Sequence, residues 1–207
     1  MNKEVLLEAQ RLFLSRYPGG FADPDLVATG KKFKMGQHGD FAREQFAESR
    51  FDAPRDIVEA MATLVSRSAL VSMFEKPKFK AAASTLSPME IEDWAGSLRQ
   101  LLHGDQKTGF ESLVAALSRH KLAKWTLVTV VPAYYDQQAE VFVKPSTAKL
   151  IIGKLALDLS YSATPTWQFY QGYREAVLKM RQIARDVKAP TNPSFTGFLM
   201  MTLDGHG

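Results

Sequence analysis

The chain has 207 residues, a formal net charge of +4 and no cysteine. The lack of cysteine excludes disulfides, thiolate catalysis and cysteine-ligated metals, and it fits a reducing compartment. Hydrophobic residues make up 45% of the chain, which is enough for one sizeable core. Because no linker-like segment divides the sequence, we expect residues 1–207 to form a single globular domain.

The lack of a recognisable targeting signal and the modest net charge favour an ordinary intracellular protein. The amino terminus shows no signal-peptide core, and no apolar run approaches the roughly 20 residues that span a bilayer. The sequence therefore predicts a soluble cytoplasmic protein without a membrane partner. Residues 104–207 carry 12 basic and 8 acidic side chains, whereas residues 1–103 are balanced. This surplus permits an anionic partner but does not require one.

Residues 1–120 are predicted to be entirely helical. Apolar residues recur there at helical spacing, in segments that begin at capping residues or at proline. The expected helices cover 3–16, about 24–34, about 41–49, a segment from Pro54, 88–103, and a segment that follows Asp105. Ser87 and Glu90 are spaced as a capping box, in which the two residues satisfy each other's exposed backbone donors. The short loop at Gly104 predicts that the last two helices are antiparallel neighbours.

Residues 121–203 are predicted to hold the only extended chain. The run 125–131 is rich in β-branched and aromatic residues and apolar on both faces, which fits a covered strand, although a short buried helix can look the same. The run 140–144 alternates polar and apolar residues and stops at Pro145. We expect the two runs to form an antiparallel hairpin. The predicted fold class is α+β, predominantly α-helical, with helices packed around this short hairpin.

The sequence after the hairpin returns to helical patterns. Ser146 and Thr147 are typical of a helix N-cap. The longest helix is expected over about 165–187, and residues 195–203 are apolar enough to pack against the body. Asp204 to Gly207 are expected to be disordered.

One short motif suggests nucleophilic catalysis. Ser146-Thr-Ala-Lys149 resembles the nucleophile motif of penicillin-binding proteins and serine β-lactamases, in which the lysine one turn along helps to activate the serine. A Lys107-Thr-Gly109 triplet is present, but it precedes the serine, and the Ser-Asp-Asn element of that family is absent. The alternative is an N-cap serine beside a solvated lysine.

A second set of residues suggests metal chemistry. Asp136, Glu140 and Lys144 resemble the acid-and-lysine set of metal-dependent nucleases, although the spacing differs and a strand-face ion pair explains the same residues. The histidines at 38, 103, 120 and 206 lack ligand spacing. We therefore expect no metal and no cofactor.

Aromatic and basic residues concentrate in the second half of the chain. The aromatic candidates for a binding surface are Tyr134, Tyr135, Trp167 and Tyr170, and the basic row on the long helix is Arg174, Arg181, Arg185 and Lys188. Arginines on phosphates and rings on bases would hold nucleic acid, whereas ordinary amphipathicity would put the rings in the core and the charges in water. Lysines also cluster at 31, 32 and 34 and at 76, 78 and 80, and they are interpreted as surface clusters.

These patterns favour a non-catalytic interaction or regulatory protein that self-associates, as a dimer, and that can take a protein partner. The alternative is a nucleic-acid-binding protein that uses the basic row. A third hypothesis is a serine hydrolase with Ser146 and Lys149.

Overall fold

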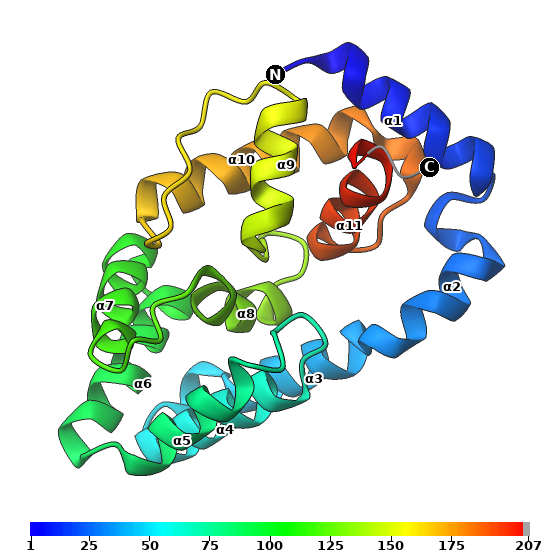
Figure 1. Ribbon diagram of the computed structural model, residues 1–207. Helices are drawn as coiled ribbons and strands as arrows, with labels where there is room; N and C mark the ends of the chain where they lie inside the picture. Colours follow the sequence, from blue (N-terminus) through cyan, green and yellow to red (C-terminus); the bar gives the residue numbers. More distant parts are fainter. Residues whose placement is uncertain (205–207) are drawn as a thin grey trace.

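The computed structural model describes residues 1–204, and within that range every regular element is a helix (Figure 1). The α-helices are α1 (Lys3–Arg16), α2 (Pro24–Gly30), α3 (Met35–Gln45), α4 (Pro54–Arg67), α5 (Lys76–Thr85), α6 (Pro88–His103), α7 (Gln106–Ser118), α8 (Trp125–Tyr135), α9 (Pro145–Lys154), α10 (Trp167–Ile183) and α11 (Asn192–Leu203). Four short 3-10 turns are η1 (Gly20–Ala22), η2 (Lys31–Phe33), η3 (Glu48–Arg50) and η4 (Arg185–Val187). The predicted disorder covers 204–207; Asp204 is described and exposed, and 205–207 lie outside the described range.

The predicted hairpin is wrong, and the α+β class falls with it. Residues 125–131 belong to helix α8, in which every residue except Tyr135 is buried. Helices α3, α4 and α7 pack against α8, so the run is apolar on all sides because it is enclosed on all sides. Helix propensity disfavours valine and threonine by only about 0.5 kcal/mol each, whereas burying a valine-sized side chain is worth about 1.5–3 kcal/mol. The free energy of packing therefore favours a helix for this segment, and Pro132 lies inside that helix.

Residues 140–144 have no strand partner among the described residues, although they lie outside any helix. Their backbone groups are satisfied by side chains and a turn. The Val143 amide donates to Thr129 Oγ1 at 3.0 Å, and the Asn192 side chain donates to the Glu140 carbonyl at 3.0 Å. The alternation of polar and apolar residues thus reflects a buried connecting segment whose hydrogen bonds go to helices.

Several helices begin where the sequence predicts. Helix α1 covers Lys3–Arg16, as predicted. The capping box that opens α6 is present, with Ser87 and Glu90 each accepting from the other's backbone. Asp105 accepts from the Thr108 amide at 2.7 Å and so caps α7, which packs along α6. These starts are set by side chains within three residues of the bonds that they make.

Other helix starts differ from the predicted positions. Helix α3 begins at Met35, well before Asp40, since Lys34 adopts the left-handed conformation that ends η2 and starts α3. Helix α9 begins at Pro145 with Lys144 as its N-cap, so Ser146 and Thr147 lie within its first turn. Helix α10 begins at Trp167, where the Thr166 side chain accepts from the Phe169 amide.

The helices lie in separate sets around α8 (Figure 1). Helices α3, α4 and α5 lie together in the lower part of the view, α6 and α7 pack against each other at its left, and α1, α9, α10 and α11 lie in the upper part. Helix α8 packs against α3, α4 and α7, and helix α2 runs along the right edge and links α1 to α3. Large side chains from several helices enter the hydrophobic core; the largest are Trp94, Trp125, Tyr134, Tyr170 and Tyr173.

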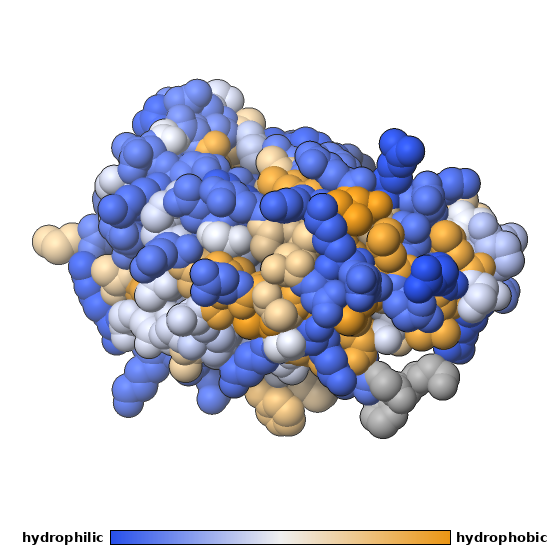
Figure 2. All heavy atoms as spheres, turned by 90° about the horizontal axis from the view of Figure 1, so that it is seen from above, coloured by the Kyte–Doolittle hydropathy of each residue, from blue (hydrophilic) through white to orange (hydrophobic). Residues whose placement is uncertain are grey.

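Some apolar side chains are exposed on the surface of the protein. On the face in Figure 2, hydrophobic residues gather toward the middle, and hydrophilic side chains interrupt them. Leu7 and Leu12 on α1 and Met200 and Met201 on α11 are exposed. No helix in residues 1–204 combines the length and the apolarity that crossing a membrane requires.

Candidate ligand-binding pocket

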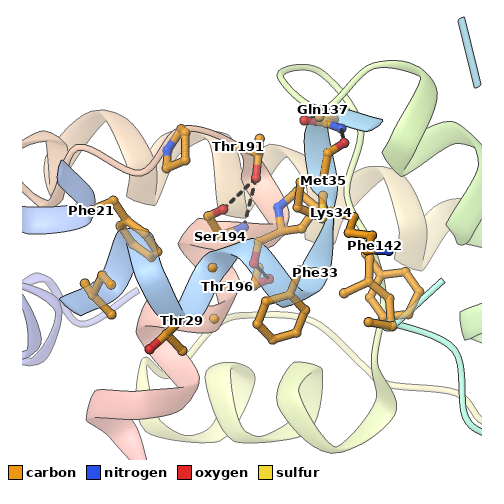
Figure 3. Close-up of a pocket in the computed structure, with 18 of the residues that line it drawn as sticks. Phe21, Thr29, Phe33, Lys34, Met35, Gln137, Phe142, Thr191, Ser194 and Thr196 are labelled. Atoms are coloured by element: carbon orange, nitrogen blue, oxygen red, sulfur yellow. Dashed lines mark hydrogen bonds between the residues drawn. The ribbon is translucent and has the colours of Figure 1, made fainter. Parts of the chain in front are cut away.

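A pocket of about 860 Å³ opens between the α2–η2–α3 segment and helix α11 (Figure 3). Phe21, Thr29 and Phe33 lie on one side of it and Ser194 and Thr196 on the other, while Phe142 reaches it from the segment before α9. Pockets that bind small molecules typically measure 300–1,000 Å³. The volume of this pocket falls within that range.

The wall of the pocket is mostly apolar. Its larger apolar side chains are Phe21, Leu26, Phe33, Met35, Phe142 and Met200. A wall of this kind binds a ligand by removing apolar surface from water, which is worth about 25 cal/mol for each Å² that is buried. The occupant that fits is largely hydrocarbon in character.

Three lysines supply the charge of the pocket. Lys31, Lys34 and Lys144 line it, and we call them the lysine rim. No aspartate or glutamate is found among the described residues of the lining, and no rim lysine forms an ion pair with another residue of the described range. Positive charge beside an apolar wall favours a negatively charged group on the ligand.

Lys34 is held in place by an unusual backbone conformation. Its φ of 49° and ψ of 36° lie in the left-handed region, which is costly for a residue with a side chain. Its amide donates to the Lys31 carbonyl at 3.2 Å, and its carbonyl accepts from the His38 amide at 3.0 Å. The junction between η2 and α3 therefore fixes the position at which this lysine enters the pocket.

Several polar groups of the wall are hydrogen-bonded within the protein. Gln137 Nε2 donates to the Met35 carbonyl at 2.7 Å, Thr191 Oγ1 lies 2.8 Å from Ser194 Oγ, and Thr196 Oγ1 donates to the Pro193 carbonyl at 3.0 Å. The lysine rim supplies the charged groups of the lining.

One wall of the pocket is only lightly packed. Neither α2 nor η2 contains a buried residue, and Val27 is 48% exposed. On the opposite wall, a Cβ added at Gly197 would meet no atom within 4 Å. The space between the walls is open, and a bound molecule would cover apolar side chains that face solvent.

A second polar cluster is built around Glu140, in the 137–144 segment, and its charged groups are paired with each other. We call it the Glu140 network. Arg174 Nη1 donates to the two Glu140 carboxylate oxygens at 2.9 and 3.1 Å, and Tyr170 Oη donates to Glu140 Oε2 at 2.5 Å. The side chains of Arg174 and Glu140 are only 17% and 8% exposed. Burial, and then the negative charge of Glu140, raise the pKa of Tyr170 well above its usual value. The tyrosine therefore stays a hydrogen-bond donor to the carboxylate.

Asn192 extends this network to helix α11. Its side-chain amide donates to the Gln138 carbonyl at 2.8 Å and to the Glu140 carbonyl at 3.0 Å, and its oxygen accepts from Arg181 Nη1 at 2.9 Å. Arg181 also donates to Gln138 Oε1 at 2.7 Å and to the Ala189 carbonyl at 2.9 Å. Burial lowers the pKa of this guanidinium. These contacts bind the 138–140 segment to α10 and α11.

The predicted basic row is divided by this arrangement. Arg174 and Arg181 point into the protein and bind Glu140 and Asn192, whereas Arg185 and Lys188 are exposed. Trp167 is half-buried, and its ring lies 5.6 Å from the Arg174 guanidinium. The structure does not bring the four cations together on one solvent-facing surface.

The predicted aromatic candidates are also mostly internal. Tyr134 is buried, with its hydroxyl 3.0 Å from Ser68 Oγ, and Tyr170 is buried in the Glu140 network. Tyr135 is half-buried, with its ring 5.5 Å from that of His103. These rings lie apart from the pocket, whose aromatic lining comes from Phe21, Phe33 and Phe142.

The residues of the catalytic hypothesis are exposed and are not hydrogen-bonded to each other. Ser146 and Lys149 are both exposed near the start of α9, and Lys149 Nζ lies 4.8 Å from the Tyr161 ring centroid. No hydrogen bond joins the two side chains within the described range. Their neighbours Lys144 and Thr147 line the pocket.

The members of the acid-and-lysine set make different contacts. Asp136 accepts from the amides of Gln138 and Ala139, Glu140 binds Arg174, and Lys144 lies on the pocket. Residues 1–204 contain no group of three or more histidine, aspartate or glutamate side chains placed to hold a metal ion. His206, one of the four histidines considered, lies outside the described range.

Sequence reasoning missed the pocket because its walls come from four separate segments of the chain. The one local signal is the run Lys31-Lys-Phe-Lys-Met35, which places cations next to apolar residues. The sequence alone gave these lysines no role beyond a surface cluster. Comparisons with protein-family models, with curated proteins and with solved structures found no match to this chain.

Proposed function

We propose that this protein is a non-catalytic binding protein that holds an apolar small molecule with a negatively charged end in the pocket between α2–α3 and α11. The observation that carries the proposal is the lining: an apolar wall around about 860 Å³, with three lysines and no described acid. This proposal narrows the interaction or regulatory role expected from the sequence to a specific site.

The chemistry of the pocket favours an amphiphilic anion such as a medium- or long-chain carboxylate. An alkyl chain would cover Phe21, Phe33 and Phe142, and the carboxylate would accept charge-assisted hydrogen bonds from the lysine rim. A lysine next to a low-dielectric wall attracts an anion more strongly than a lysine in bulk water. The two halves of the ligand therefore contribute affinity by different means, and they can be tested separately.

Titration with dansyl-labelled undecanoic acid, followed by displacement, tests the proposal. We expect saturable binding of one probe molecule, and we expect dodecanoate to displace the probe at a concentration at least about tenfold below that of dodecanol. If dodecanoate and dodecanol displaced the probe at the same concentration, the lysines would have no role in binding. Absence of saturable binding would remove the pocket as a ligand site.

A filling variant locates the binding. Gly197→Leu places a side chain in the open part of the pocket, and Gly153→Leu on the exposed face of α9 is the matched control, since an added Cβ meets no atom within 4 Å at either position. Leucine also favours helix more than glycine does, so both variants are expected to fold. Probe binding should fall at least about tenfold in the first variant and stay unchanged in the second. Equal binding by both variants would contradict the assignment.

Self-association stays part of the proposal, and the exposed apolar residues of α1 and α11 give it a surface. Light scattering should then report a mass above 23.1 kDa, and a monomer at high concentration would remove this part. The nucleic-acid and hydrolase alternatives receive less support from the geometry, since Arg174 and Arg181 are engaged internally and Ser146 lies outside the pocket lining.

A further inference from the structure

The turn between α4 and α5 exposes two large apolar side chains. Met73 and Phe74 are each 75% exposed, among the highest values for large apolar residues in the described chain. We call this pair the apolar tip. Burying a phenylalanine and a methionine would stabilise the fold, and the fold leaves both exposed. The pair therefore suggests contact with a molecule outside the chain.

The tip is braced by hydrogen bonds. The amides of Glu75 and Lys76 donate to the Ser72 carbonyl at 3.0 and 3.2 Å, and the Phe74 amide donates to Ser72 Oγ at 3.2 Å. At the base of the turn, Val71 is buried. The two side chains are therefore presented outward by a defined turn.

The charges next to the tip are positive. Lys76, Lys78 and Lys80 follow it directly, and none of the three forms an ion pair with a residue of the described range. The one acid of the turn, Glu75, is turned inward: its carboxylate accepts from Thr126 Oγ1 at 2.9 Å and from the Ser72 amide at 3.4 Å. The outward surface of the turn thus combines apolar side chains with cations.

The positive region extends from the turn toward the pocket. Burial lowers the pKa of His38, and the positive charges of Lys34, Arg67 and Lys76 lower it further. A lysine of the rim and a lysine of the turn therefore act on the same imidazole. Ala69 and Leu70, in the same interhelical loop as the tip, line the pocket itself.

The first turn of α6 is a natural contrast. Met89 is also 75% exposed, but its neighbours in the chain include Glu90 and Glu92. Exposure to this extent thus occurs in two turns of the described chain, and only at the apolar tip do lysines without an ion pair follow it.

We propose that the turn around Met73 and Phe74 docks on the surface of an anionic lipid bilayer, with the two side chains in the interfacial layer and Lys76, Lys78 and Lys80 against lipid phosphates. Flexible and aromatic apolar side chains beside long cationic ones suit the boundary between acyl chains and headgroups. The anionic surface attracts each nearby lysine. Surface docking needs no spanning helix, and this proposal departs from the expectation of no membrane partner.

This inference goes beyond the pocket and does not depend on it. If both proposals hold, docking brings the loop that lines the pocket next to the bilayer, which would be a source of amphiphilic anions. The two are distinguishable because the Gly197→Leu variant should still dock, whereas the tip variants below should still bind the dansyl probe in the absence of vesicles.

Co-sedimentation of the full chain with vesicles tests the docking. We expect binding to vesicles of phosphatidylcholine with 30% phosphatidylglycerol, weaker binding to pure phosphatidylcholine, and loss at high salt. Met73→Ser together with Phe74→Ser should weaken binding at least about tenfold. Lys78→Gln together with Lys80→Gln should weaken it by about fivefold for each lysine. Met89→Ser is the matched control and should bind as the parent does.

A site-specific probe reports insertion directly. The chain has no cysteine, so Phe74→Cys provides a single labelling site for an environment-sensitive nitrobenzoxadiazole dye. Its emission should shift to the blue on anionic vesicles, and the same dye on Met89→Cys should not respond. Equal binding to both kinds of vesicle, full binding by the Met73→Ser and Phe74→Ser double variant, or equal dye responses at positions 74 and 89 would overturn the proposal. Self-association that depends on the tip, without vesicle binding, would assign the surface to a second copy of this chain.

Discussion

The Glu140 network and the lysine rim both include residues of one short segment, 137–144, but their charged groups differ: those of the network are paired, and those of the rim have no ion-pair partner in the described range. In the network, a carboxylate and a guanidinium are buried together, and a tyrosine and a glutamine complete their hydrogen bonds. At the rim, three lysines face an apolar cavity, and no described acid of the lining neutralises them. The polar groups of the Glu140 network bind one another and stabilise the fold, whereas the charges of the lysine rim are available to a ligand.

This comparison shows how to distinguish a positively charged side chain that stabilises the fold from one that is available to bind a ligand. Arg174 and Arg181 are conspicuous in the sequence as a basic row, yet their guanidinium groups are occupied by internal partners. Lys31 and Lys34 look like routine surface residues, yet they border the cavity. The two kinds of cationic side chain differ in whether they have a hydrogen-bonding partner inside the protein. Only the tertiary structure reveals that partner.

The largest effect is expected from breaking the ion pair. Glu140→Ala leaves the Arg174 guanidinium largely buried without its carboxylate, and we expect a loss of about 3 kcal/mol in the free energy of unfolding. Urea denaturation measures it. Glu175→Ala, on the exposed face of the same helix as Arg174, is the control and should change stability by less than about 0.5 kcal/mol. Equal stability of the two variants would show that the pair does not hold the fold.

A smaller loss is expected at Asn192. Asn192→Ala removes two hydrogen bonds to the 138–140 segment and one from Arg181, and it leaves buried carbonyl groups without a donor. We expect a cost of about 2 kcal/mol, measured in the same denaturation experiment. Gln182→Ala, at an exposed position of α10, serves as the control. A loss below about 0.5 kcal/mol would mean that α11 is held by its apolar contacts alone.

At the rim, stability and binding are expected to change in opposite directions. Lys34→Gly relieves a left-handed backbone conformation and should raise the free energy of unfolding by about 0.5 kcal/mol, while probe binding weakens by about fivefold. Lys188→Gly relieves the same conformation away from the pocket and should give the stability gain without the loss of binding. Unchanged probe affinity in Lys34→Gly would remove this lysine from the site.

The smallest effect is expected from the pH dependence of His38. Burial and nearby positive charges lower its pKa in the folded protein below the ordinary 6.5, so the unfolded chain binds more protons. The stability from the neutral imidazole is therefore complete above pH 6.5 and is lost as the pH falls through the lowered folded-state pKa. Denaturation at several pH values should show a steeper decline below pH 6.5 in the parent than in His38→Asn. Parallel curves would contradict this assignment.

Parts of the fold followed directly from short sequence patterns, and others could not. The capping box at Ser87 and Glu90 and the cap at Asp105 were predicted correctly, since their partners lie three residues away. The run 125–131 was misassigned because an apolar segment has no readable period, and its enclosure by α3, α4 and α7 decided between strand and helix. The hairpin error then placed Glu140 on a strand face, whereas its partner is Arg174 on α10.

By itself, the sequence determined where several helices begin, the predominance of helix and the positions of the lysine clusters, because propensity, caps and composition act within a few residues. Only the tertiary structure decided which charges are compensated and where a cavity remains. Glu140 meets Arg174 across 34 residues and Asn192 across 52, and the pocket joins segments from Phe21 to Met201. Burial and charge pairing depend on such distant neighbours, so no local pattern can specify them.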